Sequence, residues 1–307
     1  MINGKKILVT GGAGFIGSNT IRALISNGAE VVIIDNLSTG REENIHPEAK
    51  FYRLNIADPQ VEAVFKEENP HYVYHFAFNV SVPKSVENPL LDMDSISGSI
   101  NILQNAKKYK IEKVFFVSSA WVYGNTTNIP TSENEPVSPV SPYVVSKHAV
   151  ENYLWFYRSN YGLSYVIFRY PVVYGPGQVG GAMTDYIRRL ASGQQAEIWG
   201  DGLKTRDYVY IDDVVRANLL AVELAHDYPD PIFNVGSSVE TTLNDLYNKI
   251  ARLLGKESNP IYLPDRPGEL MRCCLDYSKI KRVLNWEPKV TLDEGLKERV
   301  TSYLRSF

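Results

Sequence analysis

The sequence has few cysteines, no marked excess of charge of either sign and no long hydrophobic run, and each of these excludes a class of protein. The two cysteines, Cys273 and Cys274, are adjacent, so they predict neither a disulfide framework nor a metal site, and they favour a reducing compartment, the cytoplasm. A formal net charge of −3 over 307 residues gives no basic surface for nucleic acid or an anionic membrane. No apolar run approaches the roughly 20 residues that span a bilayer, and Met1–Thr10 lacks the features of a signal peptide.

The first part of the sequence alternates regularly between strand and helix patterns. Near-continuous apolar runs are typical of strands covered on both faces, and they occur at Lys6–Thr10, Glu30–Asp35, Phe51–Asn55, Tyr72–Phe76, Lys113–Ser118 and Tyr165–Arg169. Helical patterns lie between them, at Phe15–Asn27, Val61–Glu68, Ile100–Tyr109 and Pro142–Asn160. This alternation predicts an α/β fold, a Rossmann-type doubly wound parallel sheet with helices on both faces.

After Tyr170 the pattern changes, and proline and glycine become frequent. Helices are expected at Met183–Ser192, Leu243–Leu254 and Leu292–Ser306, a short strand at Glu197–Trp199, and irregular or strand-like structure at Pro229–Ser237 and Pro260–Met271. We therefore expect a first domain over residues 1–170, with a return segment near 207–238, and a smaller α/β lobe formed by residues 171–206 and 239–307.

A glycine-rich turn follows the first expected strand and opens the first expected helix. Gly11, Gly12, Gly14 and Gly17 fit the patterns of a turn whose backbone approaches a pyrophosphate, which then faces the amino end of the helix. Asp35 ends the next strand, where an acid would hold a ribose 2′-hydroxyl and repel a 2′-phosphate. The turn therefore predicts NAD rather than NADP, and the alternative is a structural turn with a helix-capping aspartate.

Tyr143 and Lys147 are four residues apart in the longest expected helix, so they share one face. A free tyrosine has a pKa near 10, which must fall to about 7 for the phenol to act as a base at neutral pH. A lysine ammonium group and the positive nicotinamide ring of NAD would both favour the phenolate. Ser119 lies at the carboxyl end of an expected strand, where ligands bind in such sheets. The alternatives are a surface pair on a helix and a hydroxyl that ends a strand.

Taken together, these motifs resemble the extended short-chain dehydrogenase/reductase family, and within it the nucleotide-sugar 4-epimerases that act on UDP-glucose. The stretches that carry the likeness are Thr10–Gly17, Asp35–Ser38, Ser118–Gly124, Tyr143–Lys147, Arg169–Gln178, Gly200–Asp213 and Arg266–Glu269. The resemblance implies an isomerase that holds NAD tightly and inverts C4 of UDP-hexoses through a transient 4-keto sugar. It leaves open a uronate epimerase, a nucleotide-sugar reductase and a non-catalytic NAD-binding regulator.

The resemblance also implies the roles of individual residues. The catalytic residues would be Ser119, Tyr143 and Lys147. Cofactor contacts would come from Gly11, Gly14, Phe15, Ile16, Gly17, Asp35, Asn36, Ser38, Asn55, Ile56, Phe76, Ala77, Tyr143, Lys147 and Tyr170. Substrate contacts would come from Ser119, Tyr143, Val172, Arg206, Arg266 and Cys273. The two arginines would clamp the diphosphate, because guanidinium groups match phosphate oxygens in charge and geometry; surface salt bridges are the alternative.

The sequence departs from the family pattern at several of these positions. Asn55 stands where many members have Asp, and both Ser95 and Val172 stand where many have Asn. Ala120 and Trp121 replace the Asp-Glu pair of the related dehydratases, which disfavours dehydration because neither side chain can move a proton.

Cys273 is the departure that bears on specificity, because it replaces a bulky tyrosine of the UDP-glucose-restricted members. A smaller side chain there predicts room for an N-acetyl group. The alternative is a small cysteine buried in the core.

The resemblance further implies a homodimer, with two helices of each subunit forming a four-helix interface. In this sequence those helices would be about Ile96–Tyr109 and Tyr143–Asn160. The second is rich in aromatic residues, namely Tyr153, Trp155, Phe156 and Tyr157. Aromatic residues are enriched at interfaces, although they also serve as core.

Overall fold

A seven-stranded parallel sheet forms the centre of the protein in a computed structural model that describes residues 2–79 and 81–305. The strand order is β11-β6-β5-β4-β1-β2-β3, and every neighbouring pair is parallel. The strands are β1 (Lys6–Thr10), β2 (Glu30–Asp35), β3 (Lys50–Arg53), β4 (Tyr72–His75), β5 (Lys113–Ser119), β6 (Tyr165–Tyr170) and β11 (Ile232–Asn234). The predicted fold class is confirmed, and the stretch Pro229–Ser237 contains the seventh strand.

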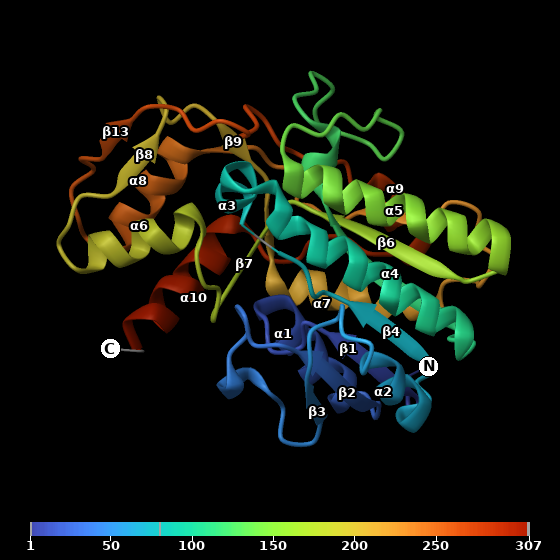
Figure 1. Cartoon of the computed structure of the whole chain (residues 1–307). Coiled ribbons are helices and arrows are strands. Elements are labelled where there is room, and N and C mark those ends of the chain that lie inside the picture. Colours follow the sequence, from blue (N-terminus) through green and yellow to red (C-terminus); the bar gives the residue numbers. More distant parts are fainter. Residues whose placement is uncertain (1, 80, 306–307) are drawn as a thin grey trace.

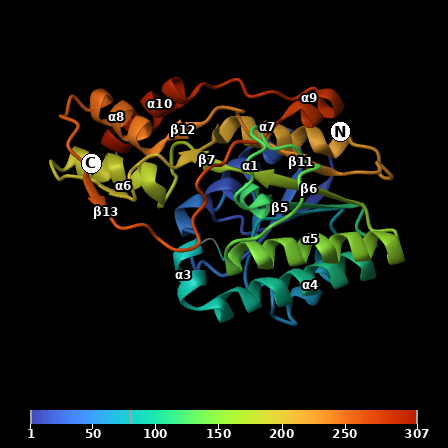
Figure 2. The same ribbon diagram turned by 90° about the horizontal axis from the view of Figure 1, so that it is seen from above.

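Helices cover both faces of this sheet, because successive side chains of each strand point to opposite sides. On β1, Ile7 and Val9 are buried in one hydrophobic cluster and Leu8 in the other. The first cluster is covered by α1 (Phe15–Ser26), α7 (Ile211–Leu220) and α9 (Ser278–Leu284). The second is covered by α2 (Val61–Glu68), α4 (Met93–Lys108) and α5 (Pro142–Tyr161). Figure 2 shows α4 and α5 on one side of the sheet and α7 and α9 on the other.

The strand order changes direction between β1 and β4. From β1 the chain proceeds outward through β2 to β3, and from β4 it proceeds the other way through β5 to β6. In open parallel sheets, ligands bind beyond the carboxyl ends of the strands at this point of reversal. The edge of the sheet that carries Thr10, His75 and Ser119 is therefore the place for a functional site.

A smaller lobe packs beside this edge, and Figure 1 shows it on the left. Its helices are α6 (Gly181–Ala191), α8 (Leu243–Leu253) and α10 (Leu292–Arg305), which share one hydrophobic cluster. Its two-stranded sheets pair β7 (Val172–Tyr174) with β10 (Tyr208–Tyr210), β8 (Glu197–Trp199) with β13 (Ile261–Leu263), and β9 (Thr205–Arg206) with β12 (Thr241–Thr242). Between visits to this lobe the chain returns to the large sheet, where α7 packs against α1 and β11 pairs with β6.

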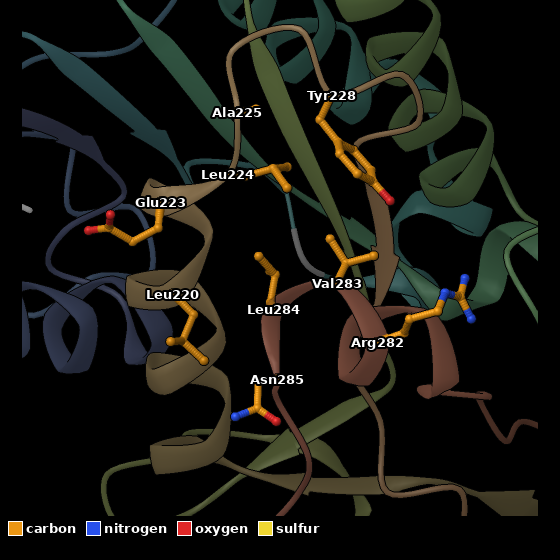
Figure 3. A pocket seen from close by; sticks show the side chains of 9 residues that line it. All are labelled: Leu220, Glu223, Leu224, Ala225, Tyr228, Arg282, Val283, Leu284 and Asn285. Carbon is orange, nitrogen blue, oxygen red and sulfur yellow. The ribbon is translucent and has the colours of Figure 1, made fainter.

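A surface cavity of about 480 Å³ lies between the end of α7 and the end of α9 (Figure 3). Its lining includes Leu224, Tyr228 and Leu284. Lys113, the first residue of β5, donates a hydrogen bond to the carbonyl oxygen of Leu224, so this cavity adjoins the amino ends of the strands. It is therefore at the opposite edge of the sheet from the expected site.

Among the described residues, no helix combines the length and the apolar character needed to cross a membrane.

Candidate active site

The glycine-rich turn between β1 and α1 is shaped by contacts that exclude side chains. A Cβ atom on Gly11, whose φ is +70°, would lie 2.6 Å from the backbone nitrogen of Ala77. One on Gly17 would lie 2.3 Å from the carbonyl oxygen of Gly11. Gly14 is the N-cap of α1 and supplies no side-chain cap, and the first turn of the helix has no acidic residue. The first N–H groups of α1 are therefore left for an anionic ligand.

Asp35 is fixed beside this turn by its own hydrogen bonds. The residue is buried, and its two carboxylate oxygens accept from the backbone nitrogens of Ala13, at 3.0 Å, and Leu37, at 2.8 Å. A Cβ atom on Gly40 would lie 3.0 Å from either oxygen. This places a negative charge at the end of β2, next to the open helix terminus. The arrangement fits NAD, because the turn accepts a pyrophosphate and the carboxylate suits a ribose diol.

The next predicted cofactor residues follow the carboxyl ends of β2, β3 and β4. The Asn36 side chain accepts from the backbone of Ser38, at 2.9 Å, and turns the loop after β2. Asn55 makes the same kind of turn with Ala57 after β3, and Ile56 is buried in the core. The backbone nitrogens of Phe76 and Ala77 donate to Thr10, which joins β4 to β1. Phe15 and Ile16 open α1, half-buried.

Tyr170 differs from the other predicted cofactor residues in where its side chain points. It is the last residue of β6, and its ring is buried in the cluster beneath α1 and α7. Its hydroxyl donates to the side-chain oxygen of Asn218 on α7, at 2.5 Å. The structure therefore places the Tyr170 side chain in the core, with only its backbone at the edge of the sheet.

Tyr143 and Lys147 occupy successive turns of α5, which begins at the carboxyl edge of the sheet. Pro142 suits the first turn of this helix, and Gly162 ends it in the left-handed conformation. Lys147 is buried, and its Nζ donates to the carbonyl oxygen of Val117 on β5, at 2.6 Å. Phe78 joins the pair, because its ring centroid lies 3.8 Å from the Lys147 Nζ and 6.1 Å from the Tyr143 ring centroid.

The surroundings of this pair shift the pKa values of both residues in the protein chain alone. Burial raises the pKa of Tyr143, with the charge of Asp92 as a second cause. Burial also lowers the pKa of Lys147 to about 7, against a smaller opposing effect of Glu151. These directions describe the protein chain alone, whereas the expected fall in the pKa of Tyr143 depends on the ammonium group together with bound NAD and stays a prediction. A phenolate at neutral pH requires a further positive charge at the site, and the nicotinamide ring of NAD is one.

Ser119 ends β5 with its hydroxyl available to a ligand. Its Oγ accepts from the backbone nitrogen of Trp121, at 3.2 Å, so its own hydrogen remains free to donate. Trp121, Tyr143 and Cys273 pack against one hydrophobic cluster. Burial raises the pKa of the Cys273 thiol to about 12, so this side chain is a neutral group in the wall of the site.

Two neighbouring segments of the smaller lobe carry the predicted arginines, and Val172 on β7 lies half-buried against the cluster of this lobe. Arg206 is buried, and its Nη1 donates to the carbonyl oxygens of Thr205, at 2.8 Å, and Leu270, at 2.9 Å. Its guanidinium also lies 5.1 Å from the Trp121 ring centroid, which ties the arginine to the end of β5.

Arg266 stacks on the Trp199 ring, with 3.6 Å between the guanidinium and the ring centroid. Lys204 completes the arrangement, because its buried Nζ pairs with Asp265, at 2.8 Å, and Glu269, at 2.9 Å. We call residues 199–206 and 265–270 the arginine clamp. Arg206 also lies 3.9 Å from Glu269, so carboxylates of the clamp balance part of its positive charge. Guanidinium groups remain the chemistry that matches phosphate oxygens.

The structure thus shows three neighbours that sequence reasoning did not single out, namely Phe78, Trp199 and Lys204. For two of them, the sequence offered a clue in the stretches that carry the family resemblance. Lys204 lies inside the stretch Gly200–Asp213, and Trp199 directly precedes it. In the described part of the chain, no group of three or more His, Cys, Asp or Glu side chains could hold a metal ion.

Comparison with known proteins agrees with this geometry. Residues 7–236 match the model of the NAD dependent epimerase/dehydratase family. The UDP-glucose 4-epimerase of Mycolicibacterium smegmatis is 38% identical over 306 residues, which cover 96% of this chain and 97% of that protein.

Two solved structures are similar over nearly all of this chain. The UDP-glucose 4-epimerase of Thermotoga maritima with UDP-glucose has a TM-score of 0.95 and 42% identity, covering 98% of this chain and 99% of that one. The UDP-N-acetylglucosamine 4-epimerase of Methanobrevibacter ruminantium, in complex with UDP-N-acetylmuramic acid, has a TM-score of 0.92 and 34% identity, covering both chains fully. The prediction of an NAD-dependent enzyme is confirmed, and the chain belongs to the NAD dependent epimerase/dehydratase family, among the extended short-chain dehydrogenase/reductases.

Proposed function

We propose that this enzyme interconverts UDP-glucose and UDP-galactose by inverting C4 of the hexose. The observation that carries the proposal is the position of Tyr143, Lys147 and Ser119 at the carboxyl edge of the sheet. The open glycine turn lies at the same edge, and Trp121 joins Arg206 of the clamp to the end of β5 there. The relatives named UDP-glucose 4-epimerase support the same substrate class.

In the proposed reaction, the chemistry that bound NAD supplies is the reversible uptake of a hydride. Tyr143 takes the proton of the 4-hydroxyl group while Ser119 donates a hydrogen bond to the same oxygen, and the sugar becomes a 4-keto hexose. The hexose then turns about its diphosphate linkage and presents its other face. Tyr143 returns the proton as the new C4–H bond forms. The cofactor is regenerated in each cycle and need not leave.

The clamp would hold the nucleotide while the hexose turns. Arg206 and Arg266 come from different segments, and each is fixed by contacts within the protein rather than by the ligand. Fixed guanidinium groups retain a diphosphate without immobilising the sugar attached to it. We propose accordingly that residues 1–170, with the return segment near 207–238, bind NAD, and that residues 171–206 and 239–307 bind the nucleotide sugar.

The test is a panel of UDP-sugars incubated with the purified enzyme, with the C4 epimers resolved by chromatography. Interconversion of UDP-glucose and UDP-galactose is expected. The variant Tyr143→Phe should retain NAD and lose turnover by about 100-fold or more, the usual contribution of general acid–base catalysis. Absence of any C4 inversion, or near-normal turnover in the variant, would contradict the proposal.

We further propose that N-acetylhexosamine nucleotides are accepted. Cys273 is small and lines the same cluster as Tyr143, so the wall there is less bulky than a tyrosine would make it. The similar structure of a UDP-N-acetylglucosamine 4-epimerase supports this specificity. Cys273→Tyr should lose activity on the N-acetylated sugars and keep it on UDP-glucose. Equal activity of the variant on both would contradict the proposal.

A second candidate is another nucleotide-sugar enzyme on this scaffold, a uronate epimerase or a reductase. UDP-glucuronate in the same panel detects the first, and consumption of NADH at its absorbance band detects the second. A non-catalytic NAD-binding regulator would not need Ser119, Tyr143 and Lys147 together.

We also propose a cytoplasmic location. This proposal rests on the two cysteines, which are both free.

We also propose a homodimer through α4 and α5, the helices expected for this role. The exposed side chains on and beside them include large apolar groups, namely Leu90, Leu91, Met93, Val145, Tyr153, Trp155 and Phe156. Trp155 is 63% exposed, and clusters of exposed apolar groups mark contact surfaces. Light scattering should give twice the chain mass for the protein and a monomer for Trp155→Glu. A monomer in both would contradict the interface.

A further inference from the structure

Lys204 is a buried lysine that the proposed reaction does not use. It lies in the loop between β8 and β9, and it is 3% exposed. Its Nζ pairs with Asp265, at 2.8 Å, and with Glu269, at 2.9 Å, both from the other segment of the clamp. Burial opposes the ammonium form, but the hydrogen bonds to these two carboxylates outweigh burial and raise the pKa of Lys204. The lysine is therefore charged, and it joins the two segments through ion pairs.

Backbone contacts that do not involve this side chain also join the two segments. Before the ion pairs, β8 pairs with β13. After them, the backbone nitrogen of Thr205 donates to the carbonyl oxygen of Met271, at 2.9 Å. Removing the lysine side chain should therefore leave the lobe folded and change mainly the charges of the clamp.

Glu269 lies beside Arg206 as well as beside Lys204. The Lys204 Nζ donates to the Glu269 Oε2, and the Arg206 Nη2 lies 3.9 Å from the same oxygen, which is too far for a hydrogen bond. The lysine thus engages the carboxylate oxygen that faces the arginine. In the described part of the chain, Glu269 forms ion pairs with these two residues, so without the lysine its remaining partner would be Arg206.

We propose that Lys204 is a positioning residue that engages Glu269, so that the Arg206 guanidinium stays available to a phosphate group of the nucleotide. The inference rests on the proposed function, in which the clamp holds a nucleoside diphosphate. A carboxylate competes with phosphate for a guanidinium group, because both anions match its fork of donors.

The charges of the whole clamp act in the same direction. It carries as many carboxylates as cations, namely Asp201, Asp265 and Glu269 against Lys204, Arg206 and Arg266. The loss of one cation therefore leaves an excess of negative charge, which repels a diphosphate. Lys204 accordingly supports nucleotide binding without contacting the nucleotide.

The test removes the charge of Lys204 and follows ligand affinity by titration calorimetry. Lys204→Met should bind UDP about 10-fold more weakly and NAD as before. Lys249→Met is the matched control, because it removes the same charge from an ion pair with Asp293 in the same lobe, and it should leave both affinities in place. Lys204→Arg keeps the charge and should retain most of the UDP affinity. In turnover, Lys204→Met should raise KM for UDP-glucose and leave kcat nearly unchanged.

A second substitution separates this role from a merely structural one. Adding Glu269→Gln to Lys204→Met removes the negative charge that Arg206 would otherwise engage, so part of the lost UDP affinity should return. A structural role predicts no recovery, because both partners of the ion pair are then gone. The inference is wrong if Lys204→Met lowers the melting temperature but not the UDP affinity, or if the double variant binds UDP no better than Lys204→Met.

Binding and turnover together distinguish this inference from the proposed function. If the affinity pattern is found but no C4 inversion occurs, the proposed function fails and the role of Lys204 stands. If the unchanged protein epimerises UDP-glucose but Lys204→Met binds UDP normally, only the inference fails. If the unchanged protein binds no UDP, both fail. Should Lys204→Met not fold, Lys204→Gln provides a second neutral variant for the same titrations.

Discussion

The glycine turn and the arginine clamp are built in opposite ways. The turn comes from consecutive residues after β1, and backbone atoms set its shape at Gly11 and Gly17. The clamp joins two segments some 60 residues apart in the sequence, and side-chain charges hold it, with Lys204 between two carboxylates. A binding site shaped by backbone atoms loses ligand affinity when a Cβ atom is added. A binding site formed by charged side chains loses ligand affinity when a charge is removed.

The largest effect is expected at the turn, in Gly17→Ala. Its Cβ atom would lie 2.3 Å from the Gly11 carbonyl oxygen, which is backbone and cannot move aside. NAD affinity should fall on the order of 100-fold, equivalent to about 2.7 kcal/mol, while UDP binding is retained. Isothermal titration with each ligand measures both.

Gly14→Ala is the matched control for that prediction, because its Cβ atom would meet the same oxygen at 3.2 Å. It should lose much less NAD affinity. Equal losses of NAD affinity in the two variants would contradict the claim that backbone contacts determine the shape of the turn.

At the clamp, Arg266→Ala removes a guanidinium that rests on Trp199. Because hydrogen bonds to charged groups contribute about 1.5–3 kcal/mol, UDP affinity should fall roughly 10- to 100-fold with NAD affinity unchanged. Arg272→Ala is the control, because this exposed arginine of the same part of the chain pairs with Glu240 instead. If Arg272→Ala weakens UDP binding equally, the clamp is not specific to the residues assigned to it.

This difference also explains what the sequence could predict. The strands, α1 and the glycine turn follow from local patterns, and β1, β2 and α2 have the predicted bounds. The clamp depends on contacts between distant segments, so the contacts that hold its arginines were not predicted. The sequence does not show that Arg266 stacks on Trp199 or that Lys204 is buried.

The chemistry of Tyr143 and Lys147 shows the same limit. Their spacing on one helix face is a local property and was predicted. Their pKa values depend on burial by residues from other elements, among them Phe78, and on the charge of a bound cofactor, so the spacing alone does not give the protonation of Tyr143. The helices α3 (Val82–Glu87), α7 and α9 were not singled out either. Helices α3 and α9 have only six and seven residues, too few for a periodic pattern to be distinctive.

The smallest predicted effect concerns Lys147, which belongs to neither region. Its pKa is about 7 in the folded chain and about 10.4 when unfolded. Between these values the unfolded state binds the additional proton, so the free energy of unfolding should rise with pH from about 7, by up to about 1.4 kcal/mol per pH unit. Above about pH 9 the thiols of Cys273 and Cys274, whose pKa values are raised to about 12, oppose this trend. The window is therefore pH 7 to 8.5.

Urea unfolding of the cofactor-free protein across that window measures the effect, and Lys147→Met should flatten the curve relative to the unchanged protein. Lys249→Met is the control, because Lys249 forms a single ion pair with Asp293 near the surface of the smaller lobe. The pH dependence of NAD and UDP affinity then tests whether the glycine turn and the arginine clamp differ in their electrostatic control. If the protonated lysine assists the cofactor, NAD must bind more weakly as pH rises through 7, while UDP affinity, set by guanidinium groups that remain charged, stays constant. A parallel loss of both affinities would mean that the two regions share one electrostatic control.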